Sequence, residues 1–152
     1  MSSFPSTSLP YSKGRPISTT HYHSTTHEVL TITTGRATLL FGGESNPRRV
    51  ELTVSPGDVI VIPAGVGHRL LKDLSSEPVS SSEPSTANAG GAGKFEMVGA
   101  YQKAAKGWDM CYGREPGDDD AETGAEERIR SLGWFERDPV YGDEGPVLGV
   151  GG

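Results

Sequence analysis

Two histidine-bearing segments constrain how this 152-residue chain can fold. The first carries His21, His23 and Glu28, and the second ends at His68, shortly after the apolar run Val59–Ile62. Residues two apart on an extended strand point to the same face, so we expect His21 and His23 to lie side by side. Four residues then separate His23 from Glu28, which is enough for a turn to bring the carboxylate back toward the two rings. The first segment alone therefore predicts three polar side chains at one point.

The second segment can bring a fourth group to the same point. Pro63 and Gly65 end the apolar run in a turn, and that turn can aim the imidazole of His68 inward. All four histidines of the chain fall within the two segments. Three imidazole nitrogens and one carboxylate oxygen suit a divalent first-row transition metal. We therefore predict a metal site with the ligands His21, His23, Glu28 and His68.

The place of Glu28 on its strand supports this prediction. Alternation puts Glu28 on the same face as Leu30 and Ile32, so the carboxylate shares a face with core residues. A buried carboxylate is costly unless it is paired, hydrogen-bonded or bound to a metal. His27 points away from that face and is interpreted as an alternative ligand or acid–base group, or else as a residue that supports the site or lies at the surface.

The spacing of these residues resembles the two sequence motifs of the cupin superfamily. The first segment has the spacing H-x-H-x-x-x-x-E and is followed, after six residues, by Gly35. The second runs from Gly57 to His68 with the spacing of the second motif, except that Lys72 stands where that motif usually has asparagine. Lys72 lies outside the predicted ligand set, so the ligands are complete.

Within the superfamily, the chain resembles the small single-domain YjlB-like cupins. The likeness rests on residues 21–30, 62–68, 98–101 and 138–142 and extends over roughly residues 19–147. It implies an all-β fold, a single-domain jelly-roll β-barrel that holds a metal between two sheets. The 21 glycines and 11 prolines are consistent with many short strands joined by tight turns.

Several further segments have the patterns of regular structure. The alternating or apolar segments predict strands at residues 28–33, 37–41, 49–54, 59–62 and 94–101. The apolar run Val59–Ile62 is expected to be buried on both faces. The acidic residues 118–120 predict the start of a short C-terminal helix over residues 121–132.

The predicted organisation is one cupin domain over residues 19–150. Residues 1–18 are rich in serine and proline and predict a flexible arm or a shortened first strand. Residues 75–93 predict a disordered surface loop inserted in the domain. Either residues 9–17 supply a shortened first strand of the barrel, or a second subunit covers the open sheet edge; because an unpaired edge is a liability, we expect a homodimer.

The net charge and the cysteine content limit the possible binding partners and the cellular location. A net charge of −6 argues against nucleic acid or an anionic membrane as a partner. The single cysteine, Cys111, excludes an intrachain disulfide framework and is expected to be packed in the core. The N-terminal residues show no signal-peptide pattern, and no apolar run approaches the length that spans a membrane. We therefore expect a cytoplasmic protein whose partner is a small-molecule substrate.

Three side chains are candidates for moving a proton at the predicted metal site: His27, Tyr101 and Tyr22. Tyr101 falls on the same strand face as Phe95 and Met97, so it lines the site if that face points inward. Trp108 and Trp134 are expected to close the core rather than to contact substrate.

Four protein ligands on an octahedral ion leave two positions open, which suits three kinds of function. The first is an oxygenase or oxidase that needs no organic cosubstrate, with iron as the first choice of metal and manganese, nickel, copper or zinc as alternatives. The second is a non-redox isomerase, epimerase, cyclase or decarboxylase. The third is a non-catalytic cupin that binds a small molecule. The chain shows no phosphate-binding loop and no nucleophile pair, so nucleotide-dependent and covalent mechanisms are not favoured.

Overall fold

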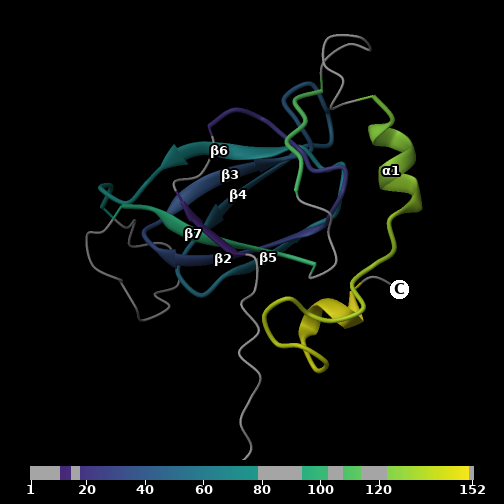
Figure 1. The fold of residues 1–152 in the computed structure, drawn as a ribbon. Helices are drawn as coiled ribbons and strands as arrows, with labels where there is room; N and C mark the ends of the chain where they lie inside the picture. The colour runs from purple at the N-terminus through teal and green to yellow at the C-terminus, as the bar shows by residue number, and fades with distance from the viewer. Residues whose placement is uncertain (1–10, 15–17, 79–93, 103–107, 114–122, 151–152) are drawn as a thin grey trace, which may run out of the picture.

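The computed structural model describes residues 11–14, 18–78, 94–102, 108–113 and 123–150, and its described strands form two antiparallel sheets (Figure 1). One sheet has the order β1-β7-β2-β5 and the other β4-β3-β6. The strands are β1 (Tyr11–Gly14), β2 (Glu28–Thr34), β3 (Ala37–Phe41), β4 (Val50–Val54), β5 (Val59–Ile62), β6 (His68–Asp73) and β7 (Glu96–Tyr101). The helix α1 (Ala125–Ser131) and the 3₁₀-helix η1 (Pro146–Gly149) follow them. The predicted all-β fold with a short C-terminal helix is confirmed.

A tight turn at Gly35 leads the chain from one sheet to the other. Gly35 has a φ of 72°, in the left-handed region that glycine adopts without strain. A Cβ at this position would lie 2.8 Å from the Cα of Phe95. The turn therefore needs glycine both for its backbone conformation and for the space beside Phe95.

The main core lies between the two sheets. Its buried residues come from β2, β3, β4 and the start of the β7 segment: Ile32, Ala37, Leu39, Val54 and Phe95. Burying a side chain such as Ile32 stabilises the fold by about 1.5–3 kcal/mol. Glu28 begins β2 on this inner face, which explains how the fold carries the carboxylate to the barrel interior.

A second apolar cluster covers the outer face of β2 and β7. Val29 and Ala100 on these strands pack against Phe135 and Val147 of the C-terminal segment. Asp138 fixes that segment, because its buried carboxylate accepts hydrogen bonds from the N–H groups of Val140, Tyr141 and Val147. The strand that supplies Glu28 is therefore covered on both faces.

Two of the predictions about burial are wrong. Among the described strands, β5 lies at a sheet edge and pairs with β2 alone, and its first residue, Val59, is 43% exposed, so the run is not buried on both faces. Trp108 is 50% exposed and does not close the core. Cys111, in contrast, is fully buried, as expected.

The boundaries of the other predictions differ in smaller ways. The helix begins at Ala125, not at residue 121, because Gly124 precedes it with a φ of 75°; residues 121–122 lie outside the described residues. Within the predicted arm, Tyr11–Gly14 pairs with β7, while residues 1–10 and 15–17 lie outside the description. In the predicted loop 75–93, the hydroxyl of Ser75 accepts the N–H of Arg36, and residues 79–93 lie outside the described part of the chain. No helix in the described part of the chain is long and apolar enough to cross a membrane.

Candidate metal centre

The two histidine-bearing segments pair directly through their backbones. The N–H of His68 donates to the carbonyl of His21 at 2.8 Å, and the N–H of His21 donates to the carbonyl of His68 at 3.2 Å. This isolated bridge brings the two rings to a centroid distance of 4.3 Å. The N–H of Gly65 also donates to the carbonyl of His23, at 2.8 Å. The turn before β6 is therefore held against the first segment, as the spacing predicted.

The three motif histidines form a buried cluster. His21, His23 and His68 are each at most 6% exposed, and one ring nitrogen from each lies within 4.8 Å of those of the other two. Such a cluster could hold a metal ion.

Hydrogen bonds fix the tautomer of all three rings. The Nδ1 atoms of His21 and His68 lie 3.0 Å from the carbonyls of Thr19 and Val66, and Nδ1 of His23 contacts the carbonyl of Asp109. A carbonyl oxygen only accepts, so each Nδ1 carries the hydrogen and donates it. In a neutral ring, Nε2 is then left with a free lone pair, which is the form that binds a metal.

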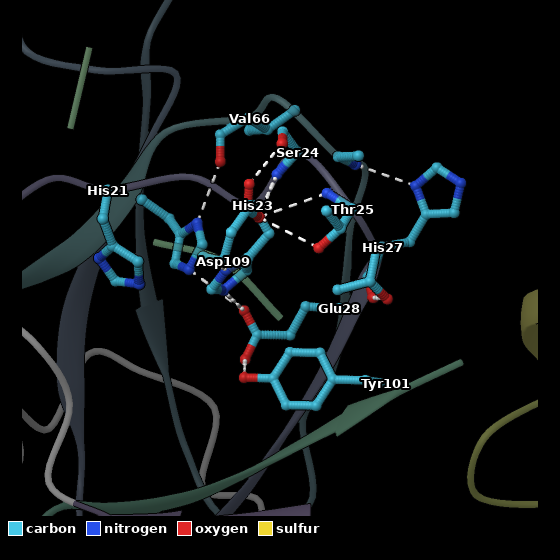
Figure 2. A network of polar contacts seen from close by, with 12 residues as sticks. His21, His23, Ser24, Thr25, His27, Glu28, Val66, Tyr101 and Asp109 are labelled. Carbon is cyan, nitrogen blue, oxygen red and sulfur yellow. Dashed lines mark hydrogen bonds and ion pairs between the residues drawn. The ribbon is translucent and has the colours of Figure 1, made fainter. Parts of the chain in front are cut away.

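Glu28 lies at the same cluster. Its Oε2 atom is 3.3 Å from Nε2 of His23 and 3.2 Å from Nε2 of His68, and its Oε1 accepts a 2.8 Å hydrogen bond from the hydroxyl of Tyr101 (Figure 2). Oε2 is buried, and among the described residues it has no hydrogen-bond partner of good geometry. Two neutral imidazoles in this tautomer have no proton to offer it. These four residues therefore fit a bound cation, which the lone pairs and the carboxylate oxygen would share.

The pKa shifts of His23 and Glu28 also indicate a site that favours positive charge. Burial alone would lower the pKa of His23, but contact with Glu28 and with the Asp109 carbonyl raises it above the usual value. Burial would raise the pKa of Glu28, but His23 and His68 hold it well below its usual range. Burial, with the neighbouring rings, lowers the pKa of His21. The carboxylate thus attracts positive charge, either a proton or a metal ion.

Gly99 on β7 makes room for the carboxylate. A Cβ at this position would lie 2.6 Å from Oε1 of Glu28 and 3.2 Å from the hydroxyl of Tyr101. Any larger residue would push Glu28 away from the histidines or break its contact with Tyr101. The space is therefore part of the site.

Asp109 ties a third segment to the cluster. Its Oδ1 accepts the N–H of Ser24 at 2.8 Å and the N–H of Thr25 at 3.3 Å, and its Oδ2 contacts the Ser24 hydroxyl. Arg128 of α1 donates to the Ser24 hydroxyl at 2.7 Å and lies 3.6 Å from Oδ2 of Asp109. Figure 2 shows the contacts of Asp109 with Ser24 and Thr25, which hold the turn between His23 and Glu28.

The three candidate acid–base residues lie in different places. Tyr101 contacts Glu28, whereas the ring of His27 is directed away from Glu28 (Figure 2). Nδ1 of His27 accepts the N–H of Ala64 at 2.9 Å, and its Nε2 lies 3.2 Å from the carbonyl of Gly133. Tyr22 exchanges two backbone hydrogen bonds with Cys111, and alternation directs its side chain away from the face of His21 and His23. The structure therefore brings Tyr101 to the cluster and directs the ring of His27 away from it, while strand alternation argues against Tyr22.

The sequence prediction missed Asp109 and Gly99. Asp109 is separated from Ser24 by 85 positions, and nothing in the local sequence distinguishes it from the other acidic residues. Gly99 sits within a strand pattern, where an isolated glycine indicates a close approach by another group. That signal could have identified Gly99, but not its neighbour Glu28.

Comparison with known proteins supports the resemblance seen in the sequence. Residues 10–80 match the sequence model of a family described as "Cupin domain". An uncharacterized protein from Bacillus subtilis (strain 168), YjlB, is 32% identical over 130 residues, which are 86% of this chain and 63% of YjlB. The chain thus spans less than two thirds of the length of this curated relative.

Solved structures that match part of this chain include plant and bacterial proteins. Vicilin from Corylus avellana (hazelnut) is 20% identical with a TM-score of 0.45, and the match covers 82% of this chain and 29% of vicilin. Oxalate decarboxylase from Lactobacillus farciminis, solved as a formate complex, is 17% identical with a TM-score of 0.40, and the match covers 60% of this chain and 22% of that protein.

Proposed function

Because this chain is a YjlB-like cupin, we propose that it is a metal-dependent enzyme acting on a small organic molecule, and specifically an oxygenase or oxidase that needs no organic cosubstrate. The observation that carries the proposal is the buried cluster of His21, His23 and His68, in which Nε2 of His23 and of His68 face Oε2 of Glu28 at 3.3 and 3.2 Å. Iron is the proposed metal, held by His21, His23, Glu28 and His68.

The metal, when bound, would supply Lewis acidity and one-electron redox chemistry to a substrate that binds through two oxygens or through oxygen and sulfur. The chain's own residues would orient the side chains that hold the metal. The three backbone carbonyls fix the imidazole tautomers, and Tyr101 fixes the carboxylate of Glu28. Their burial keeps bulk water from the ligand atoms.

Tyr101 is the residue best placed to hold or move a proton at the site. Its hydroxyl donates a hydrogen bond to Oε1 of Glu28, next to the proposed ligand atoms. His27 is not favoured for this role, because both of its ring nitrogens contact backbone groups of other segments. Tyr101→Phe removes only the hydroxyl and none of the proposed ligand atoms. If Tyr101 moves a proton, this variant should lose activity while it still binds metal.

Metal analysis followed by oxygen uptake tests the proposal. Protein purified without a histidine tag or added metal is measured by inductively coupled plasma mass spectrometry, then given a panel of enols, diols, thiols and catechols in an oxygen electrode. We expect about one iron per chain and substrate-dependent oxygen consumption. Zinc or nickel without oxygen uptake would support a non-redox isomerase or lyase instead. Protein that binds no metal under any loading condition would contradict the proposal.

A further inference from the structure

Trp108 is a large aromatic residue that stands half in water beside the buried histidines. The residue is 50% exposed, and its ring centroid is 5.9 Å from that of His23, with an interplanar angle of 83°. It is also 6.3 Å from the ring of Tyr101 and nearly parallel to it, at 10°. His23 meets Tyr101 edge to face as well, at 5.7 Å and 89°. Three rings thus surround one corner of the candidate metal centre.

The backbone next to Trp108 is held firmly in place. The carboxylate and carbonyl of Asp109 bind Ser24 and His23, and Cys111 exchanges two backbone hydrogen bonds with Tyr22. An exposed aromatic ring on an anchored segment is presented to solvent in a defined position. That arrangement suits a contact surface, because little conformational entropy is lost when a partner packs on it.

Trp134, unlike Trp108, is packed against its neighbours. Trp134 packs against His27 and Phe135, and its Nε1 donates to the carbonyl of Val147 at 2.9 Å. Its indole is part of the apolar cluster under the C-terminal segment. Packing therefore accounts for Trp134, whereas it leaves half of the Trp108 surface unused.

We propose that Trp108, together with Tyr101, forms an aromatic subsite beside the metal centre that receives a planar ring of the substrate. The substrate class is an aryl-bearing chelating molecule, such as a catechol, an aryl hydroxy acid or an aryl enol. The inference rests on the proposed function, because the chelating group would bind the metal while the ring packs on Trp108. Aromatic rings interact favourably at centroid distances of about 4.5–7 Å, and Trp108 lies 5.9 Å from the ring of the proposed ligand His23, so Trp108 is placed to contact a ring carried by a metal-bound group.

Two matched chelators test the subsite on protein loaded with Co²⁺. Acetohydroxamate and benzohydroxamate share the same metal-binding group, and only the second carries a ring. By isothermal titration calorimetry we expect benzohydroxamate to bind about 3- to 10-fold more tightly than acetohydroxamate, the range that stacking of one aromatic pair gives. The ratio should fall to about 1 in Trp108→Ala and in Trp108→Leu, which keeps apolar bulk without a ring.

The controls separate this inference from the metal proposal. Tyr141→Ala removes a comparably exposed aromatic from the C-terminal segment and should keep the full ratio. Cobalt content should be unchanged in both Trp108 variants, because Trp108 supplies no ligand atom. An unchanged ratio in metal-loaded Trp108→Ala and Trp108→Leu would overturn the subsite alone. Failure of the wild-type protein to bind Co²⁺ would overturn the metal centre, and the subsite with it.

Discussion

Nδ1 of His23 donates a hydrogen bond to the backbone carbonyl of Asp109, 86 residues further along the chain. The side chain of the same aspartate binds the backbone and hydroxyl of Ser24, the residue that follows His23. One residue thus fixes both the ring of a proposed ligand and the turn that leads from it to Glu28. Mutation of groups that orient a metal ligand in this way typically lowers metal affinity by about 10- to 100-fold.

Asp109→Ala should therefore weaken metal binding while leaving all four proposed ligands in the chain. The carbonyl remains, but the loss of the carboxylate frees the segment that positions it. We expect metal affinity to fall by about 10- to 100-fold, measured by competition with a chromogenic chelator. Asp109→Asn retains one acceptor oxygen and should recover part of the loss. Wild-type affinity in Asp109→Ala would show that the carbonyl is positioned by other contacts.

Gly99→Ala should also weaken metal binding, through a steric effect. The added Cβ would lie 2.6 Å from Oε1 of Glu28, so the carboxylate must move from the position it shares with the histidines. We expect at least a 10-fold loss of metal affinity, comparable to removing an orienting group. Gly133→Ala is the matched control, because a Cβ there would meet no atom of the described residues within 4 Å. Equal losses in both variants would point to a general effect of replacing glycine.

His23→Ala and His68→Ala should remove bound metal and leave the barrel folded. Each substitution takes away one Nε2 atom of the buried cluster, and neither residue belongs to an apolar core cluster. His27→Gln is the comparison, since His27 lies in the same segment but contacts Ala64 and Gly133 instead. Metal content and circular dichroism of the three variants check the prediction. Stoichiometric metal in both alanine variants would contradict the ligand assignment.

The stability of the protein should respond to pH through Asp109. Burial would raise the pKa of its carboxyl, but hydrogen bonds from Ser24, Cys111 and Thr25 lower it from 3.8 to about 2. A carboxyl whose pKa is lower in the folded state stabilises the fold above its unfolded pKa, and that contribution disappears as pH falls from 3.8 to 2. It amounts to about 2 kcal/mol.

The comparison of wild type with Asp109→Asn isolates this contribution, because other carboxyls titrate equally in both proteins. The wild-type protein should be the more stable at neutral pH, and the difference in Tm should shrink between about pH 4 and about pH 2. A difference that stays constant through this range would mean that the charge of Asp109 adds no stability.

The clustering of the four proposed ligands was predictable from sequence because it depends on short-range spacing. His21 and His23 share a face through strand alternation, and a single turn brings Glu28 to them. Placing His68 beside them required one further inference, the turn at Pro63 and Gly65. The backbone bridge between His21 and His68 confirms that the two segments meet.

The parts of the site that surround the ligands were not predictable in this way. Asp109, Gly99 and Trp108 come from segments far from the histidines, and their roles depend on tertiary contacts that local patterns do not encode. Trp108 was predicted to be in the core because large aromatic residues usually are buried. The edge position of β5 was missed for a similar reason, since an apolar run does not reveal how many neighbours its strand has.

Asp138→Ala should destabilise the fold without touching the metal centre. Its buried carboxylate accepts three backbone N–H groups in the segment that covers β2 and β7. Each buried donor left without a partner costs about 1–3 kcal/mol, so we expect a loss of about 3 kcal/mol in the free energy of unfolding. In a chain of this size that lowers Tm by roughly 6–12 °C.

Asp143→Ala provides the control in the same segment. Its exposed carboxylate pairs with Arg137, with Nε and Oδ1 2.6 Å apart, and exposed ion pairs contribute about 0–1 kcal/mol. Differential scanning calorimetry of the metal-free variants would measure both effects, and metal affinity should stay at the wild-type value in Asp143→Ala. A similar Tm for the two variants would mean that the three hydrogen bonds to Asp138 do not hold the C-terminal segment on the sheet. The packing of Phe135 and Val147 on Val29 would then have to do so alone.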